Sequence, residues 1–149
     1  MEKISHILIP VNGNPEDEVA LMLAGGIAKR NKAKVTVVHV VEVQRALPVD
    51  AELPAETARG EKVLDGADEQ ARHLDVNVTV ELLQARQAGP AIIDEASALK
   101  ADLIVMGLPH RKEFGTFRLG ETSNYVLSHA ECRVWLVREK YSALKDSSA

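Results

Sequence analysis

The stretch that decides the fold is ADLIVMGLPHRKEFGTFRLGETSN, residues 101–124. Its apolar run Leu103–Met106 is typical of a fully buried strand. Gly107 ends this strand, a basic loop follows, and Gly120 opens a segment that is predicted to be helical. A strand, a glycine-bounded loop and a helix N-terminus together form a common cradle for phosphate, because free backbone N–H groups point at the bound anion. In a parallel sheet this place, at the carboxyl end of a strand, is where ligands usually bind.

The rest of the chain alternates between predicted strands and predicted helices. Apolar or β-branched runs predict four further strands, at Ile4–Val11, Val35–Val43, Asn77–Ala85 and Arg133–Val137. Helical spacing of apolar residues predicts helices at Glu16–Lys32, Thr57–Leu74, Gly89–Lys100 and Glu121–His129. Strands that alternate with helices indicate a parallel sheet with right-handed crossovers and helices on both faces. The predicted fold class is therefore α/β, a single-domain three-layer sandwich.

Three more detailed expectations follow from the same patterns. The third strand, Asn77–Ala85, alternates at first and is expected near a sheet edge, whereas the first strand is expected in the centre. Segment Gln44–Glu56 contains two prolines and no clear period, which predicts an irregular, mobile excursion beside a cleft. The inward face of the first helix is predicted to carry Val19, Met22, Leu23 and Ile27. The predicted core contains Ile7, Ile9, Val37, Val38, Ile104 and Val105.

Composition limits the class of protein. A chain of 149 residues suits one domain, which we place at residues 1–140, followed by a flexible tail at 141–149. The net charge of −4 argues against nucleic acid as a partner. No apolar run is long enough for a membrane span, and the N-terminus lacks a signal-peptide pattern, so no membrane insertion is expected. The single cysteine, Cys132, fits a reducing cytoplasm and is expected to be a packed residue.

In order and spacing, the chain resembles the universal stress proteins over nearly its whole length. The similarity is carried by ILIPVNGNPEDEVAL, VVHVVEV, GPAIIDEASALKADLIVMG and SNYVLSHAECRVWLVR. The resemblance implies a five-stranded parallel sheet in the order 3-2-1-4-5, of the adenine nucleotide alpha hydrolase-like type. It also implies a cytoplasmic homodimer in which the final strands, here Arg133–Val137, pair across the two subunits.

One branch of that family binds ATP, through a motif of a glycine, two residues, a second glycine, nine residues, and a glycine followed by serine or threonine. Gly107 and Gly120 match the first and third glycines, and His110 replaces the second. Glu121 replaces the serine or threonine, and Asn12 replaces an acidic residue that follows the first strand and helps to hold adenosine. By resemblance, the candidate nucleotide-binding residues are Pro10, Asn12, Val40, Met106, Gly107, His110, Gly120, Glu121, Thr122 and Ser123.

Each replacement has more than one interpretation. His110 either donates a hydrogen bond to phosphate or faces solvent, and Asn12 either bonds a ribose or adenine or is simply a favoured turn residue. A Glu121 carboxylate about 5 Å from a phosphate charge is repelled by roughly 3 kcal/mol at an effective dielectric near 20. That corresponds to about a hundredfold in affinity, which basic loop residues offset only in part. Because a carboxylate in the first helical turn suits the same N–H groups, we expect Glu121 to replace an anion.

These observations predict a dimeric regulatory or binding protein with a degenerate nucleotide pocket and weak or no ATP binding. No cofactor is expected to be required, and ATP or AMP are the possible ligands. Two alternatives stay open: an ATP- or AMP-binding switch, and an accessory module that regulates a membrane transporter as a protein partner. No catalytic constellation or metal-ligand cluster is present at short spacing, so an enzyme is not expected.

Overall fold

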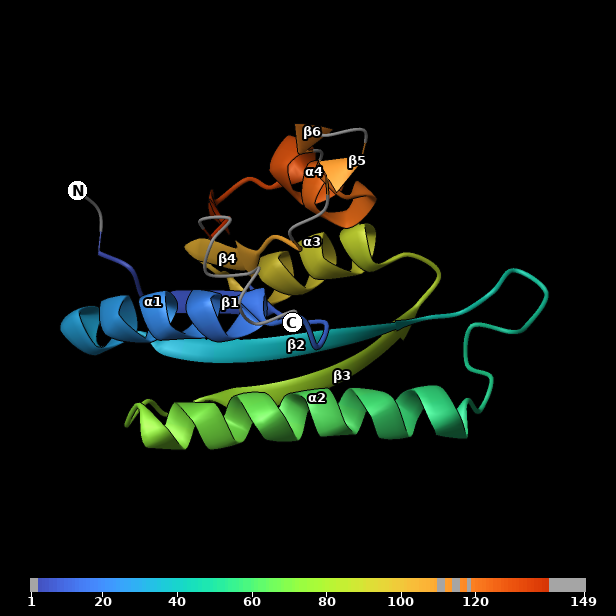
Figure 1. The fold of residues 1–149 in the computed structure, drawn as a ribbon, viewed down its shortest axis with the longest axis horizontal. Coiled ribbons are helices and arrows are strands. Elements are labelled where there is room, and N and C mark those ends of the chain that lie inside the picture. The colour runs from blue at the N-terminus through green and yellow to red at the C-terminus, as the bar shows by residue number, and fades with distance from the viewer. Residues whose placement is uncertain (1–2, 110–111, 114–115, 118, 140–149) are drawn as a thin grey trace.

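A computed structural model of the chain describes residues 3–109, 112–113, 116–117 and 119–139. The elements alternate along the chain, and Figure 1 shows their arrangement. They are β1 (His6–Pro10), α1 (Glu16–Asn31), β2 (Lys34–Glu42), α2 (Pro54–His73), β3 (Thr79–Ala85), α3 (Ala88–Leu99), β4 (Leu103–Gly107), β5 (Lys112–Glu113), β6 (Thr116–Phe117), α4 (Glu121–His129) and β7 (Arg133–Val137).

The main sheet has five parallel strands in the order β3-β2-β1-β4-β7. This confirms the predicted order 3-2-1-4-5, with β7 as the fifth strand, and it confirms that the third strand lies at an edge. β1 pairs with β2 on one side and with β4 on the other, since Ile7 lies opposite both Val35 and Leu103. The chain therefore leaves the ends of β1 and β4 in opposite directions, which opens a crevice between them.

Two hydrophobic clusters fill the space between the sheet and its helices. On one face, Ile7, Ile9 and Val37 pack with residues of α1 and α2. On the other face, Leu8, Val38 and Ile104 pack with residues of α3 and α4. Each central strand is thus covered on both sides, which explains its nearly continuous apolar sequence. All six predicted core residues are fully buried: Ile7, Ile9, Val37, Val38, Ile104 and Val105.

The predicted inward face of α1 is wrong at Met22 and Leu23, whereas Ile27 packs against the core as predicted. Met22 and Leu23 are 51% and 46% exposed, whereas Ala20, Leu21, Ala24 and Ala28 are buried. The helix lies close to the sheet, so its contact face is made mainly of alanines spaced four apart together with Leu21, and the side chains of Met22 and Leu23 are left outside. A pattern based on hydrophobicity alone favours the larger side chains, which is why it selected the wrong face.

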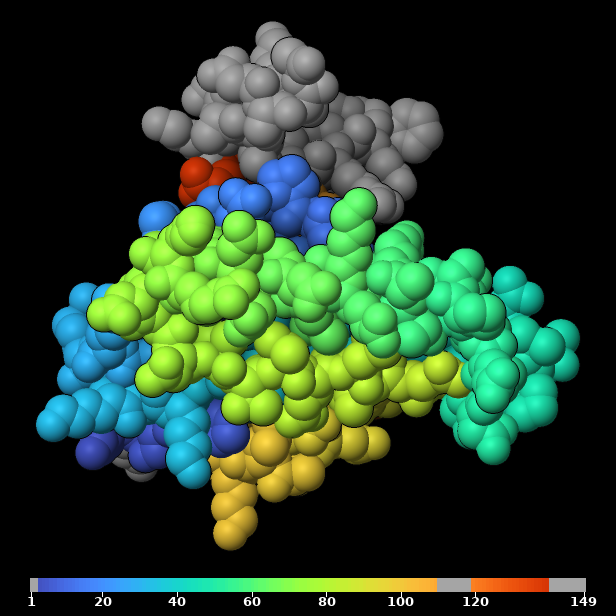
Figure 2. Space-filling view, turned by 90° about the horizontal axis from the view of Figure 1, so that it is seen from below, coloured from blue at the N-terminus to red at the C-terminus, as the bar shows by residue number. Residues whose placement is uncertain are grey.

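Segment 44–56 is irregular over residues 44–53, as expected, and its last three residues belong to helix α2. Helix α2 begins at Pro54, and proline is well suited to a first helical position. The remaining loop is tied to β3 and the residue after it. The Arg86 guanidinium donates to the carbonyl oxygens of Gln44 and Leu47, each at 2.6 Å. The Gln84 amide donates to two further loop carbonyls. Figure 2 shows this loop at one end of the face on which α2 and β3 lie side by side.

The loop after β4, expected to be irregular, contains a two-stranded antiparallel hairpin formed by β5 and β6. His110, Arg111 and Arg118, which belong to the predicted cradle, lie outside the described residues, as does the predicted tail at 141–149. Among the helices that the structure describes, none combines the length and the apolar character needed to cross a bilayer.

Candidate functional site

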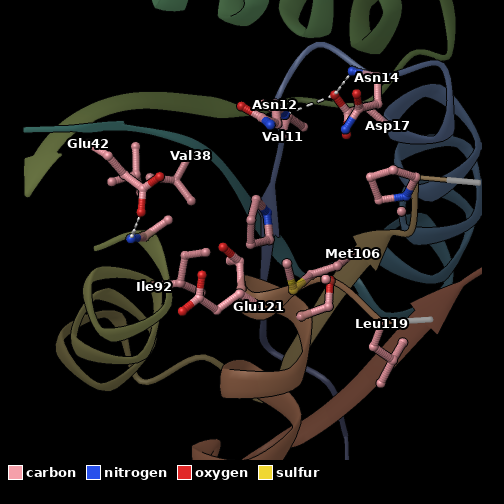
Figure 3. A pocket seen from close by; sticks show the side chains of 18 residues that line it. Val11, Asn12, Asn14, Asp17, Val38, Glu42, Ile92, Met106, Leu119 and Glu121 are labelled. Atoms are coloured by element: carbon pink, nitrogen blue, oxygen red, sulfur yellow. Dashed lines mark hydrogen bonds between the residues drawn. The ribbon is translucent and has the colours of Figure 1, made fainter. Parts of the chain in front are cut away.

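A cavity of about 390 Å³ lies in the crevice at the carboxyl ends of β1, β2 and β4. The first turns of α1, α3 and α4 point toward the same place, so several helix N-termini converge on it (Figure 3). In addition to residues predicted from sequence, the lining includes Val11, Asn14, Asp17, Val38, Glu42, Ala88, Ile92, Pro109 and Leu119. The cavity size falls in the usual range for small-molecule sites.

Nine of the ten predicted site residues meet at this cavity, although they come from four separate parts of the chain. They are Pro10, Asn12, Val40, Met106, Gly107, Gly120, Glu121, Thr122 and Ser123. The tenth, His110, lies outside the described residues. The shared edge of the sheet explains this convergence, because residues at the ends of parallel strands are neighbours. Their role in ligand binding stays a prediction.

Gly107 is needed for packing at the end of β4. A Cβ atom added at Gly107 would collide with the backbone carbonyl oxygen of Glu16 and would lie 2.6 Å from its carbonyl carbon. The first motif glycine therefore lets the start of α1 approach the end of β4. Gly120 differs, because a Cβ atom there would meet nothing within 4 Å and its φ of −70° suits any residue. The two motif glycines thus have different reasons to be present.

The turn between β1 and α1 forms an anion-binding arrangement that the chain fills itself. The backbone N–H groups of Asn12, Gly13 and Asn14 all donate to one carboxylate oxygen of Asp17, at 3.0, 2.7 and 3.0 Å. Gly13 has a φ of +86°, which allows the turn to close. Figure 3 shows Asn12, Asn14 and Asp17 together at one end of the cavity. Asp17 therefore shapes the turn that places Asn12 in the lining.

Burial raises the pKa of Asp17, while the three N–H donors act in the opposite direction. The sequence analysis did not identify Asp17 as a residue of the site. The missed signal is its spacing: a carboxylate three residues beyond Asn14 can reach back to the N–H groups of the turn, as in other N-terminal capping arrangements.

Glu42 is a second lining residue that the sequence analysis missed. It ends β2, and its carboxylate accepts the backbone N–H of Ala88 at the start of α3, at 3.0 Å. The carboxylate thus satisfies one of the free donors at that helix end. Its place could have been inferred from topology, because the last residue of a strand next to β1 must lie at the same edge of the sheet.

The start of α4 leaves polar groups without partners. The first hydrogen bond there runs from the Asn124 N–H to the Gly120 carbonyl, at 3.0 Å, and no side chain caps the helix. Glu121 is exposed, and no described residue hydrogen-bonds its carboxylate. The expectation that Glu121 satisfies the helix N–H groups is therefore not met within the described chain. Ser123 is only 5% exposed, yet no described residue hydrogen-bonds its hydroxyl group.

The charge of the lining is one-sided. Three carboxylates, from Asp17, Glu42 and Glu121, line the cavity, and the described lining contains no lysine, arginine or histidine. Within the described residues, no three His, Cys, Asp or Glu side chains are grouped closely enough to hold a metal ion.

Cys132 is partly buried, and burial raises the pKa of its thiol, which makes it a poor nucleophile.

Buried His39 lies beside the cavity but outside its lining. Its Nδ1 donates to the carbonyl oxygen of Val11 at 2.9 Å, since a carbonyl can only accept. A Cβ atom at Gly60 would lie 2.8 Å from the His39 ring, so α2 packs directly on this side chain. The histidine therefore joins the end of β1 to β2 and has a packing role next to the cavity.

Comparison with known proteins places the chain in a family. The model of the universal stress protein family matches residues 3–138. A curated relative from Staphylococcus aureus (strain USA300), also named after these proteins, is 32% identical over 140 residues, covering 89% of this chain and 83% of the relative.

Solved structures share the fold. A universal stress protein from Archaeoglobus fulgidus superimposes with a TM-score of 0.78 at 21% identity, covering 89% of this chain and 97% of that one. The universal stress protein from the same organism in complex with dAMP superimposes with a TM-score of 0.73 at 20% identity, covering 91% and 98%. At these identities the structures show a common fold, and the dAMP belongs to that protein. With the family model matched over almost the whole chain, this protein belongs to the universal stress protein family.

Proposed function

We propose that this protein is a non-catalytic binding protein whose cavity takes an adenine nucleoside and binds ATP weakly at best. The observation that carries the proposal is the lining of the cavity, which combines apolar side chains from the central strands with three carboxylates. The fold is shared with a protein that is described in complex with dAMP.

The apolar side of the cavity suits a flat base. Pro10, Val38 and Val40 come from the central strands, and Ile92 and Met106 face the same space from α3 and β4. Burying the faces of a purine against such side chains is favourable, at about 25 cal/mol for each Å² of apolar surface removed from water. At the other end of the cavity, Asn12 offers an amide that can donate to and accept from a ribose.

The acidic residues of the lining do not suit a triphosphate. A phosphate that approached the free N–H groups of α4 would lie near Glu121, whose negative charge exceeds the roughly half charge of the helix N-terminus. At about 5 Å and an effective dielectric near 20, the repulsion is roughly 3 kcal/mol before screening. Glu42 and Asp17 add negative charge to the same lining. The nucleoside part is therefore expected to dominate binding.

Calorimetric titration with adenosine, AMP and ATP tests the proposal. We expect adenosine and AMP to bind and ATP to bind no more tightly than AMP. Glu121→Ser removes the repulsion and adds a hydroxyl group, so ATP affinity should rise by about tenfold to a hundredfold, most strongly at low salt. Glu56→Ser is the matched control, because Glu56 is also an exposed acidic residue in the first turn of a helix and lies outside the cavity.

Two results would contradict the proposal. One is a wild-type protein that binds ATP with low micromolar affinity, which would favour the nucleotide-switch alternative. The other is an ATP affinity that Glu121→Ser and Glu56→Ser change equally, because the effect would then be a general one of net charge.

We further propose that the protein acts as a homodimer that pairs through β7. Within the described chain, β7 is bonded only to β4, so its other edge is open, and Val134, Trp135, Leu136 and Val137 are all half-buried. An apolar edge strand of this kind favours pairing with another strand. Light scattering at micromolar concentration should give twice the mass of the chain, and Trp135→Lys should shift it to the mass of one chain. A wild-type monomer would contradict this assembly.

A further inference from the structure

We propose that the cavity selects a nucleoside whose ribose 5′ side carries a positive charge in place of a phosphate. The inference rests on the proposed function, because it assumes that the apolar side of the cavity holds the base. It goes further by naming the chemical class of the ligand's other end.

The carboxylates of the cavity differ in what they already bind. Asp17 accepts three backbone N–H groups of its own turn, and Glu42 accepts the Ala88 N–H. Glu121 alone has no hydrogen-bond partner among the described residues. In Figure 3 Glu121 lies near Ile92, on the side of the cavity opposite Asp17. A ligand cation would therefore find one carboxylate available and two that add attraction from further away.

A second, independent observation comes from Ser123. Its side chain lines the cavity, is 95% buried, and has no hydrogen-bond partner in the described chain. A buried hydroxyl group without a partner is costly, and so it indicates a group that the bound state supplies. An ammonium group suits both residues chemically, because it carries three donors and no acceptor, while the serine oxygen and the Glu121 carboxylate both accept.

The competing ligand is a phosphate on the free N–H groups of Glu121, Thr122 and Ser123. Those groups alone would favour an anion. However, a full negative charge on Glu121 outweighs the partial charge of a helix N-terminus, and the described lining supplies no cation to reverse the balance. The charge of the described lining therefore points to a cation rather than to an anion, and the two ligand classes can be compared directly.

The test is a titration of the wild-type protein with adenosine, 5′-amino-5′-deoxyadenosine and AMP at pH 7 and low salt. The 5′-amine is a primary alkylamine and is protonated at this pH. We expect the amine to bind about fivefold to tenfold more tightly than adenosine, and AMP to bind more weakly than the amine. The advantage should shrink as salt is raised.

Two variants and a control locate the effect. In Glu121→Gln the ratio of amine to adenosine affinity should fall to about one, and in Ser123→Ala it should fall by a few-fold. Glu56→Gln, which removes a carboxylate from the first turn of α2 outside the cavity, should keep the wild-type ratio. Thermal unfolding of each variant confirms that the fold is intact.

The possible failures are distinguishable. If adenosine binds but the amine binds no more tightly, or if the ratio persists in Glu121→Gln, the inference of a cationic ligand is wrong and the proposed function stands. If AMP binds more tightly than the amine, the phosphate class replaces the cationic class. If none of the three ligands binds, the proposed function is wrong and this inference fails with it.

Discussion

Substituting Gly107 by alanine should damage both the fold and the cavity, although the side chain gains only one methyl group. The added Cβ atom would collide with the Glu16 carbonyl oxygen, and would lie 2.6 Å from the carbonyl carbon and 2.9 Å from the Glu16 Cβ atom. Two of these three neighbours are backbone atoms in the first turn of α1, so no side-chain rotation relieves the clash. The start of the helix or the end of β4 must move.

The magnitude follows from overpacking of a close-packed interior. Such substitutions typically lower the free energy of unfolding by about 1–3 kcal/mol. Because the clashes here are with backbone atoms, we place the loss for Gly107→Ala at about 3 kcal/mol. For a domain of this size, each kcal/mol lowers the melting temperature by roughly 2–4 °C. We therefore expect a fall of about 6–12 °C. The displacement of α1 should also widen the cavity and weaken any ligand that contacts both Gly107 and Asn12.

Thermal unfolding followed by circular dichroism measures the effect, and Gly120→Ala is the matched control. Gly120 belongs to the same sequence motif, but an added Cβ atom there meets nothing within 4 Å. Its replacement should cost no more than about 1 kcal/mol, as expected when alanine replaces glycine at a helix N-cap. Equal losses in the two variants, or a Gly107→Ala protein as stable as wild type, would refute the assignment of Gly107 to helix packing.

Three further predictions concern other parts of the molecule. Met22→Gln should change the free energy of unfolding by less than about 0.5 kcal/mol, because the Met22 side chain is exposed. Leu21→Ala should lower it by about 2–5 kcal/mol, because Leu21 is buried. Unfolding in denaturant compares the two variants. Burial, together with Glu95, raises the pKa of Glu81, so the ionised form is disfavoured in the fold and stability falls as pH rises through that raised pKa. Glu81→Gln should then be more stable than wild type by about 0.5 kcal/mol at pH 7 and equal to it at acid pH. Arg86→Ala removes both guanidinium bonds to the 44–53 loop, so amide exchange should speed up there and stay unchanged in α3.

The fold could be predicted because the strands carry strong local signals. Leu103–Met106 and the β-branched second strand are buried on both sides, so their sequences are mostly apolar, and the strand order is the one that the family resemblance implies. The face of α1 could not be predicted in this way. Hydrophobicity favours Met22 and Leu23, but the distance between helix and sheet favours alanine, and that distance is a property of the packed structure.

The sequence predicted which positions of the chain form the candidate site. It did not reveal the hydrogen bonds within the site. Gly107, Gly120 and the ends of the strands are fixed by loop length and topology, which the sequence pattern reports. Asp17 and Glu42 were missed because their roles depend on which N–H groups they reach: Asp17 turns back to residues 12–14, and Glu42 spans to Ala88, 46 positions away. Such bonds become visible only when the strands are placed beside one another.

These contacts suggest how the cavity came to be acidic without losing its shape. In a site that binds phosphate, the N–H groups at turns and helix starts need a bound anion to satisfy them. Here Asp17 accepts three N–H groups of the β1–α1 turn and Glu42 accepts the Ala88 N–H at the start of α3, so both places already have a carboxylate as a partner. At the start of α4 no described side chain caps the helix, and there Glu121 and the buried Ser123 line the cavity. The choice of ligand therefore depends on this one helix end, which is why Glu121 and Ser123 are the residues whose replacement separates the competing ligand classes.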